Sequence, residues 1–273
     1  MTSKEPLGIL AGEGQFPLLV ARGAKSRGRE IVAVAFKGHT SEEIIPWTDK
    51  ISWLYLGQLG KMISFLHKSR VQEVVLAGGI NKPRALNLRP DLQAAKLLLQ
   101  SRSRNDNALF QTLLSTLSKQ GLRVASPLKY VPELRTPAGC LSRRRPSKQE
   151  QADIDFGWDL AKKIGSLDIG QCLVVKKRMV VAVEAMEGTN AAILRAGELA
   201  GPGCVVLKVF KPGQEEHIDQ PALGLQTIKT MLKAEASCLV AEAGRSLFFD
   251  REQALKLADH KDICVLGQEV SSA

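Results

Sequence analysis

Aromatic residues and long apolar runs are scarce in this sequence. Phe, Trp and Tyr make up 5% of its 273 residues, and it has no helix-turn-helix, RNA-recognition or zinc-finger signature, so we expect no nucleic-acid partner. No run approaches the roughly 18 uncharged apolar residues that can cross a bilayer. The start, MTSKEPLGIL, also lacks the pattern of a secretory signal. We therefore expect a folded cytoplasmic protein.

The five cysteines form no framework that a metal or a set of disulfides would need. They are odd in number and widely spaced, and four of them lie in or beside apolar runs that resemble strands. We interpret them as small buried hydrophobic residues. They are Cys140, Cys172, Cys204, Cys238 and Cys264.

The excess of positive charge lies entirely in the first half of the chain. Residues 1–135 hold 20 Lys and Arg against 10 Asp and Glu, whereas residues 136–273 hold 18 of each kind, which accounts for the net charge of +10. Such a field favours an anionic partner, either a phosphorylated metabolite or an anionic membrane surface. The alternative is a basic surface without a dedicated partner.

The first half alternates short apolar strands with helical segments. Strands are predicted at 7–11, 31–36, 51–56 and 73–77 and within GLRVAS. One helix is predicted to begin at about residue 16, another to end at about residue 69, and two more to span 91–101 and 106–120. This alternation indicates an α/β domain with a mostly parallel, doubly wound sheet. The helix in LGKMISFLHKSR has an apolar and a basic face, which suit either core packing or a membrane surface.

A second α/β domain is predicted after a stretch rich in proline and arginine. We place the first domain at residues 1–135, a linker at 136–148 and the second domain at 149–273. The second domain begins with a helix at about 149–165, followed by two adjacent strands in QCLVVKKRMVVAVEAM. Further strands and helices follow in an order that predicts a mixed sheet.

The turn LAGEGQFP places Gly12 and Gly14 between a buried strand and a helix that begins near Pro17. Backbone N–H groups in such a turn can meet a phosphate, although a tight turn alone also explains two glycines. A dinucleotide-dependent oxidoreductase is a weaker hypothesis. The third glycine of its fingerprint is missing, and Lys37 lies where an acidic residue would be expected.

A second glycine turn, LAGGINKP, follows another strand and brings Gly79, Asn81 and Lys82 to the same edge of the predicted sheet. Two turns at one edge predict a crevice for a ligand. Asp106 either points into that crevice or caps the helix that follows it.

The second half has two acidic regions at strand ends. Glu184 and Glu187 follow a buried strand in VEAMEGTN, where a carboxylate must be paired, hydrogen-bonded or bound to a metal, and Gly188 and Thr189 can open the next helix. A capping arrangement and a ligand site explain this pattern equally well.

The stretch VLKVFKPGQEEHIDQPALGLQTI, residues 206–228, interleaves basic and acidic side chains in one loop. Such a loop can hold a phosphate together with a divalent cation, or it can be a solvated charged loop. Its charged and polar residues are Lys208, Lys211, Gln214, Glu215, Glu216, His217 and Asp219.

Read together, these motifs resemble the LpxI-type UDP-2,3-diacylglucosamine diphosphatases, a family of pyrophosphatases. The resemblance runs nearly from end to end, and several short motifs occur in the same order. They are LAGEGQFP, the AGG-x-N-K turn, Asp106 with Ala108 and Leu109, LDIGQ at 167–171, VEAMEGT with Arg195, and KPGQ…D-x-P…G…TI from 211 to 228.

The resemblance implies a Rossmann-like N-terminal domain and a C-terminal catalytic domain. The implied enzyme hydrolyses UDP-2,3-diacylglucosamine to lipid X and UMP in lipid A biosynthesis, with Mg²⁺ as cofactor. It would meet the inner membrane peripherally, and the sequence leaves a homo-oligomer open. The resemblance carries over Asp219 as the catalytic or metal-binding carboxylate. From the residues themselves, we predict Glu215 as its catalytic partner and Glu184 and Glu187 as further metal ligands. The predicted substrate-binding residues are Gly12, Gly14, Gly79, Asn81, Lys82, Asp106, Thr189, Lys211, Gln214 and His217.

Four positions depart from the family pattern. Glu215 and His217 replace an aspartate and an arginine of the acidic loop, and Asn107 and Asn190 stand where acidic residues are usual. These changes remove negative charge near the expected metal and make one cation titratable. They motivate an alternative hypothesis, a nucleotide-sugar or lipid-binding homologue with altered or no catalysis.

Overall fold

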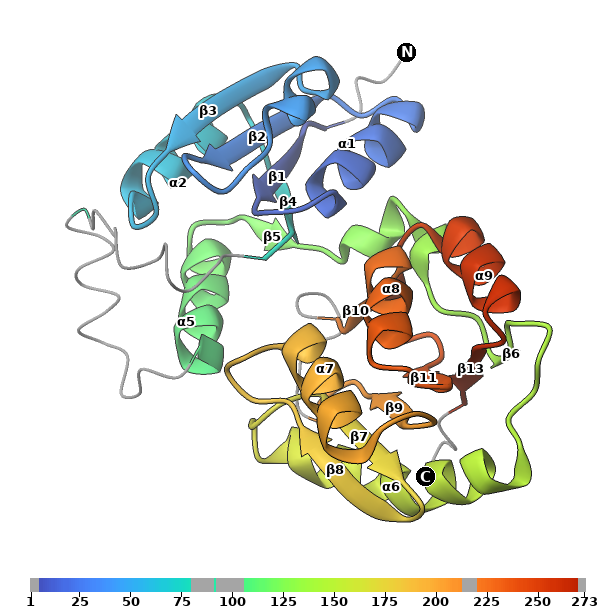
Figure 1. The fold of residues 1–273 in the computed structure, drawn as a ribbon. Helices are drawn as coiled ribbons and strands as arrows, with labels where there is room; N and C mark the ends of the chain where they lie inside the picture. Colours follow the sequence, from blue (N-terminus) through green and yellow to red (C-terminus); the bar gives the residue numbers. More distant parts are fainter. Residues whose placement is uncertain (1–4, 80–90, 92–105, 213–219, 270–273) are drawn as a thin grey trace. The chain divides into compact units, whose positions relative to one another are not determined.

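The computed structural model describes residues 5–79, 91, 106–212 and 220–269. The chain divides into two compact units, Met1–Pro132 and Glu133–Ala273. Both are α/β, as the sequence predicted (Figure 1). Among the described residues, none of the helices has the length and apolar character needed to cross a membrane.

The first unit is built on a five-stranded parallel sheet in the order β3-β2-β1-β4-β5. Its central strands are apolar and buried along almost their whole length, which is typical of a parallel sheet covered on both faces. The strands are β1 (Leu7–Ala11), β2 (Ile31–Phe36), β3 (Lys50–Leu54), β4 (Glu73–Ala77) and β5 (Arg123–Val124).

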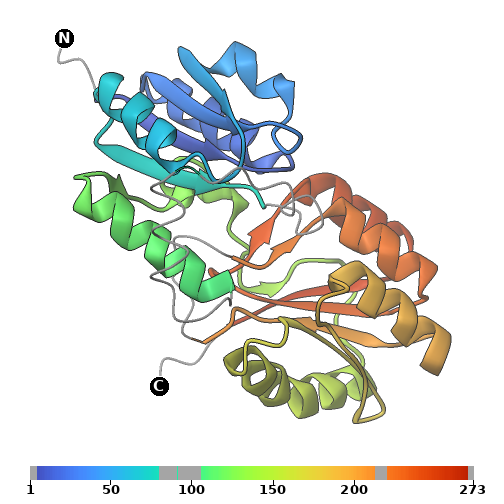
Figure 2. The same cartoon turned by 90° about the vertical axis from the view of Figure 1, so that its left-hand side faces the viewer.

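Helices cover both faces of this sheet (Figures 1 and 2). On one face, α2 (Leu59–Lys68) and α5 (Asp106–Lys119) share an apolar cluster with β1, β2 and β4. The opposite face is covered by α1 (Phe16–Ser26), beside the 3₁₀ helix η1 (Glu42–Trp47). Because Leu59, Met62, Ile63 and Leu66 of α2 are buried, the apolar face of this helix packs in the core.

The second unit contains a six-stranded mixed sheet in the order β6-β13-β11-β9-β7-β8. Strands β9, β11 and β13 are parallel, whereas β7 is antiparallel to β9, β8 to β7, and β6 to β13. The strands are β6 (Gly139–Cys140), β7 (Cys172–Lys176), β8 (Met179–Val183), β9 (Val205–Lys208), β11 (Cys238–Glu242) and β13 (Cys264–Gln268).

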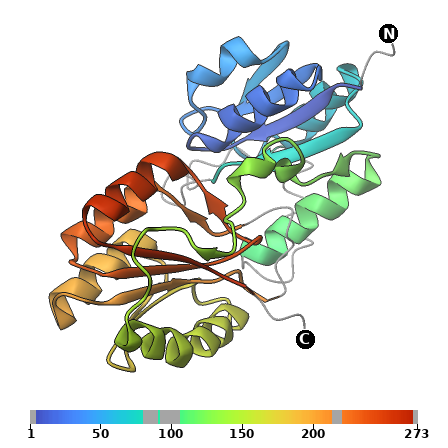
Figure 3. The same cartoon turned by 90° about the vertical axis from the view of Figure 1, so that its right-hand side faces the viewer.

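This sheet is also sandwiched between helices (Figure 3). One face packs against α6 (Lys148–Ser166) and the other against α7 (Thr189–Ala200), α8 (Leu225–Lys233) and α9 (Arg251–His260). A small parallel pair, β10 (Ala222–Leu223) and β12 (Leu247–Phe248), completes the unit. The mixed sheet confirms the predicted fold class.

The stretch predicted as a linker, residues 136–148, contributes to the second unit. It contains β6, and buried Thr136 exchanges backbone hydrogen bonds with Ser246 and Gly244. Helix α6 begins at its end, where Ser147 and Glu150 form a capping box. The short 3₁₀ helices η2 (Pro127–Lys129) and η3 (Pro132–Leu134) precede this stretch.

All five cysteines are free thiols. Four are buried, as the sequence predicted, whereas Cys140 is exposed, so the prediction of burial was wrong for this residue of the edge strand β6. Burial raises the pKa of the Cys172 thiol to about 12, with a smaller contribution from the charge of Glu184. This thiol therefore stays protonated at neutral pH.

Candidate functional site

The two glycine turns of the first unit are in direct contact. Gly12 follows β1 and donates its N–H to Ala77 O at 2.8 Å, and Glu13 donates to Gly79 O at 2.7 Å. A Cβ atom on Gly12 would lie 2.4 Å from Gly79 O, and one on Gly78 would lie 2.4 Å from Glu13 O. Only glycine allows the turns to approach this closely.

This contact lies at the topological switch point of the sheet. The chain passes from β1 outward to β2 and β3, and then returns to β4 on the other side of β1. Ligands of doubly wound folds bind beyond the carboxyl ends of the strands at this point. The prediction that Gly12, Gly14 and Gly79 share one edge is therefore confirmed in geometry, whereas their role in binding stays a prediction.

A cleft of about 260 Å³ lies beside the first turn, where α1 begins. Gly14 has a φ of +84°, and a Cβ atom there would meet open space. Nearby, His39 Nδ1 lies 2.7 Å from Glu13 Oε1, and Thr40 donates to Ala11 O. The cleft is lined by Gly14, Gln15, Pro17, Leu18, Thr40, Ser41, Glu43 and Ile44.

The structure places Glu184 at the edge of the second sheet, just beyond β8. Its side chain is buried and accepts hydrogen bonds from Thr189 Oγ1 at 2.9 Å and from the Gln171 N–H at 3.3 Å. Thr189 is the first residue of α7. The Glu184 carboxylate is thus hydrogen-bonded at the carboxyl edge, but it does not cap α7, which begins after Gly188 without a side-chain cap hydrogen bond.

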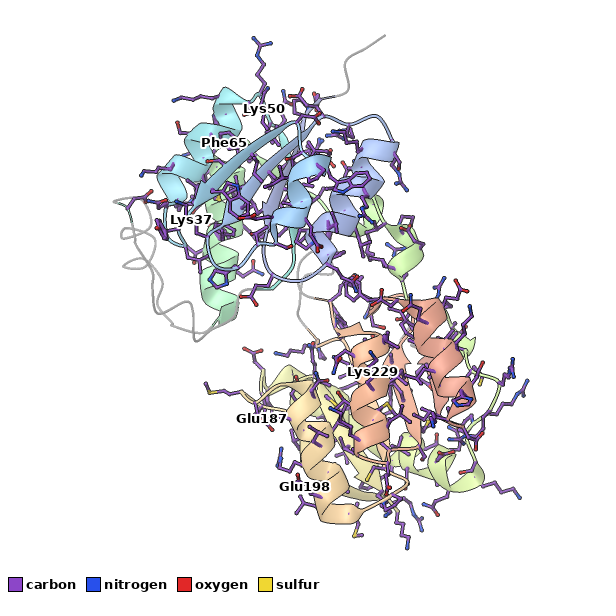
Figure 4. All side chains as sticks on the ribbon, turned by 45° about the horizontal axis from the view of Figure 1, so that its top comes forward. Lys37, Lys50, Phe65, Glu187, Glu198 and Lys229 are labelled. Atoms are coloured by element: carbon purple, nitrogen blue, oxygen red, sulfur yellow. The ribbon has the colours of Figure 1, made fainter. Side chains whose placement is uncertain are left out.

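Glu187 belongs to the same turn but points outward, as Figure 4 shows at the start of α7. It accepts a hydrogen bond from the Ala185 N–H at 3.0 Å and from Arg195 Nη2 at 2.7 Å. Its own backbone N–H, together with these two donors, holds the pKa of Glu187 below its usual value. The carboxylate is therefore ionised at neutral pH.

Lysines gather where β9 ends. Lys208 is buried, and its Nζ donates to Ala222 O at 2.5 Å. Lys211 Nζ donates to Asp168 Oδ1 at 2.8 Å, and the Cα of Lys211 also lies close to Gly165. The turn that carries Asp168 leads into β7. It is adjacent to the Glu184 turn, since a Cβ atom on Gly170 would lie 1.9 Å from Glu184 O.

Sequence reasoning missed a buried ion pair at this edge. Glu242 ends β11 and pairs with Lys162 of α6, with 2.5 Å between Lys162 Nζ and Glu242 Oε2. Arg245 lies 3.7 Å from the other carboxylate oxygen. The sequence does show that Glu242 ends an apolar strand, a position where a carboxylate needs a partner. It does not show that Lys162 and Arg245 are the cations that lie beside it.

Several predicted site residues lie outside the described residues. Asp106 is the first residue of α5, but its side chain is not among the described atoms, so both interpretations of it stay open. The remaining ones are Asn81, Lys82, Gln214, Glu215, His217 and Asp219. Their roles stay predictions.

Carboxylate oxygens are the hard ligands that Mg²⁺ prefers, so the donor chemistry of Glu184 and Glu187 fits this ion. Within the described ranges, however, no group of three or more His, Cys, Asp or Glu side chains could hold a metal by itself. A third ligand would have to come from elsewhere, and Asp219 was predicted for that role. The metal site stays a prediction.

A Rossmann-like unit whose two glycine turns are in contact, followed by a mixed α/β unit with charged residues along one sheet edge, defines a two-unit α/β protein. Residues 6–134 match the LpxI N-terminal domain, and residues 137–266 match the LpxI C-terminal domain. The chain belongs to the LpxI family.

A curated relative agrees with this assignment. The chain is 32% identical over 274 residues to the UDP-2,3-diacylglucosamine pyrophosphatase LpxI of Caulobacter vibrioides, and the match covers 96% of each protein. The resemblance inferred from short motifs is therefore confirmed.

Solved structures give only distant likenesses. The biotin carboxylase domain of a thermophilic 2-oxoglutarate carboxylase has a TM-score of 0.30 at 11% identity, with 63% of this chain and 35% of that one covered. Biotin carboxylase from Campylobacter jejuni has a TM-score of 0.29 at 12% identity, with 72% and 42% covered. The chain thus spans well under half of these structures.

Proposed function

We propose that this protein hydrolyses the pyrophosphate bond of UDP-2,3-diacylglucosamine to lipid X, which is 2,3-diacylglucosamine 1-phosphate, and UMP, a step of lipid A biosynthesis. The observation that carries the proposal is the match of both halves to the two LpxI domains, together with the identity to the Caulobacter pyrophosphatase over nearly the whole chain. The charged edge of the second sheet is compatible with this chemistry.

The proposed roles follow from what pyrophosphate hydrolysis requires. Charge on the bridging phosphates must be neutralised, for which Lys211 and Lys82 are suited. A water molecule must be oriented or deprotonated, for which we propose Asp219 with Glu215. The N-terminus of α1, which begins at Phe16 just after the Gly12–Gly14 turn, is suited to a phosphate, whereas the Gly12 and Glu13 N–H groups already donate to Ala77 O and Gly79 O.

Mg²⁺ is the proposed cofactor, and Asp219, Glu184 and Glu187 are the residues that would hold it. When bound, it would neutralise phosphate charge in the transition state. Between the two glutamates, Glu187 is the more accessible, since 34% of its side chain is exposed whereas Glu184 is buried.

Mass-spectrometric detection of lipid X and UMP tests the proposal, with and without Mg²⁺. The wild type should form both products only when the metal is present, and Asp219→Ala should abolish turnover. The matched control is Asp159→Ala, which removes an exposed aspartate of α6 and should leave turnover unchanged.

Two outcomes would contradict the proposal in different ways. If Asp219→Ala is as active as the wild type, the site assignment is wrong. If the wild type binds UMP or lipid X in a thermal-shift assay but forms no product at any Mg²⁺ concentration, the chain is a binding homologue instead, which the substitutions Asn107, Asn190, Glu215 and His217 would then explain. A shift with NAD(H) would point to the oxidoreductase alternative.

Peripheral contact with the inner membrane is part of the proposal. The side chains of Leu167, Ile169 and Met186 are 70%, 48% and 92% exposed and lie on the two adjacent turns next to Lys211. Asp168 and Glu187 on the same turns are paired with Lys211 and Arg195, which lowers their repulsion from an anionic leaflet. Exposed apolar side chains of this kind are typical of a surface that contacts a membrane, where a diacylated substrate would be met.

Flotation with phosphatidylglycerol and phosphatidylethanolamine vesicles tests this contact. Replacing Leu167, Ile169 and Met186 together by serine should abolish flotation. The control replaces Met179 and Leu199, which are 63% and 67% exposed but belong to the other ends of β8 and α7. Equal flotation of both variants would refute the assignment of this surface.

A further inference from the structure

Two side chains from different elements hold the backbone of Phe210. The Phe210 N–H donates to Glu242 Oε2 at 2.9 Å, and Lys162 Nζ donates to Phe210 O at 3.0 Å. The same Lys162 Nζ lies 2.5 Å from Glu242 Oε2, so the three groups close into one network. Glu242 comes from the end of β11 and Lys162 from the last turns of α6.

The network holds the chain just beyond the end of β9, where the strand no longer does so. Strand β9 ends at Lys208, and the Val209 N–H that follows it still donates to Gln171 O at 2.9 Å. Phe210 therefore has both backbone polar groups satisfied by side chains instead of by a neighbouring strand. Its position depends directly on Lys162 and Glu242.

The residue that follows is Lys211, for which a phosphate contact is proposed above. Lys211 Nζ meets Asp168 at 2.8 Å, and its Cα lies close to Gly165. Arg245 extends the network toward the surface, since its guanidinium lies 5.7 Å from the centre of the Phe210 ring and 3.7 Å from Glu242 Oε1. Two cationic side chains, Lys162 and Arg245, thus lie beside the buried carboxylate of Glu242.

The energetics argue against a purely structural role for this pair. The Glu242 side chain is 0% exposed, and its Oε1 accepts no hydrogen bond from the described residues. A buried carboxylate with an unsatisfied oxygen is costly, and replacing a buried ion pair by apolar side chains often leaves stability equal or higher. Apolar side chains could fill the same space, but they could not hold both backbone polar groups of Phe210 beside the proposed site.

We infer that Glu242 and Lys162 are a positioning pair for hydrolysis, which fixes Phe210 and thereby presents Lys211 to the phosphates without touching the substrate. This inference rests on the proposed function. Misplacement of a binding group by about 1 Å can reduce a rate about 100-fold. Loss of the pair should therefore lower kcat much more than it changes KM or the folding of the unit.

The decisive variant is the apolar double replacement Lys162→Met with Glu242→Leu, because it leaves no unpaired buried charge. Its melting temperature should fall only modestly, because removal of the buried ion pair offsets part of the cost of leaving the Phe210 N–H and C=O without these partners. By contrast, kcat for UDP-2,3-diacylglucosamine should fall roughly 10- to 100-fold with KM changed less than about threefold. The single variant Glu242→Gln keeps an acceptor for the Phe210 N–H, so its kcat should be higher than that of the double replacement.

A double-mutant cycle shows whether the pair acts through Lys211. In a Lys211→Ala background, the same double replacement should lower kcat by no more than about threefold, because the group that it positions is already gone. The control is Arg144→Met with Glu150→Gln, which removes another ion pair of the same unit. It should leave kcat within about twofold of the wild type.

The outcomes separate this inference from the proposed function. A wild type without turnover refutes the proposed function, and the inference falls with it. An active wild type whose double variant keeps full kcat, or loses as much kcat in the Lys211→Ala background, refutes the positioning role alone. Hydrogen exchange of the Phe210 amide should accelerate at least tenfold in the Lys162→Met, Glu242→Leu variant. Unchanged exchange would show that Lys162 and Glu242 do not fix the backbone of Phe210.

Discussion

Replacing Glu73 by glutamine should destabilise the first unit by about 3 kcal/mol at neutral pH. Glu73 begins β4, and its side chain is only 3% exposed. Lys129 Nζ and Tyr130 Oη each lie 2.8 Å from Oε1, and Arg123 and Arg29 lie 3.2 and 3.6 Å from Oε2. One carboxylate therefore balances three cations.

The magnitude follows from the ionisation of this carboxyl. Burial by itself would raise the pKa of Glu73, but hydrogen bonds from Lys129 and Tyr130 and the nearby charges lower it from 4.5 to about 2. Each pKa unit corresponds to about 1.4 kcal/mol, so the difference gives about 3 kcal/mol. Because the folded pKa is depressed, this stability is present above pH 4.5 and is lost as pH falls toward 2.

Urea unfolding can isolate the first unit optically. Trp47 and Trp53 belong to it and Trp158 to the second unit, so a Trp158→Phe background reports the first unit alone. Glu73→Gln should lower the unfolding free energy at pH 7 and flatten its dependence on pH between 4.5 and 2.

The matched control is Glu30→Gln. Glu30 pairs with Lys50 at 3.0 Å, but their side chains are 39% and 51% exposed, and exposed pairs contribute only about 0–1 kcal/mol. If Glu73→Gln loses no more stability than Glu30→Gln, or keeps the acid dependence of the wild type, the pairing energy assigned to this cluster is wrong.

Three further predictions concern the second unit. Gly170→Ala should destabilise it by about 2 kcal/mol or more in urea unfolding followed by Trp158, because the new Cβ would lie 1.9 Å from Glu184 O; an unchanged midpoint would show that the two turns can separate freely. Cys140 should be the one thiol of five that a bulky thiol reagent modifies in the folded protein, which intact-mass measurement can count. Arg144→Met should cost about 3–5 kcal/mol, since it leaves the carboxylate of Glu150 buried without its bidentate partner, and urea unfolding at pH 7 will measure this loss.

The sequence predicted the strands of both sheets except β6, and the mixed character of the second sheet, because apolar runs of about five residues between turn residues carry that information locally. It also predicted that the two glycine turns lie at one edge of the first sheet. That they touch could not be predicted, because their contact depends on β4 lying beside β1, which is a property of strand order. The proline-rich stretch likewise showed no sign that Gly139 and Cys140 pair with β13.

Charged partners were beyond sequence reasoning for a similar reason. Lys162 and Glu242 are separated by 80 residues, and Glu73 and Lys129 by 56. Which cation meets which carboxylate is decided by register and helix placement. The buried glutamates themselves are visible in the sequence, since each begins, ends or follows an apolar strand where an unpaired carboxylate would be costly.

The contact between the glycine turns has a consequence for the thermodynamics of binding. Fixing the backbone of one residue costs roughly 1–2 kcal/mol, so ordering a three-residue turn such as Gly12–Gly14 costs roughly 3–6 kcal/mol. Its hydrogen bonds to Ala77 and Gly79 impose that order when the unit folds. A phosphate that binds this turn therefore meets a preordered backbone, and its affinity is governed by the strand pairing beneath the turn as much as by the groups that touch it.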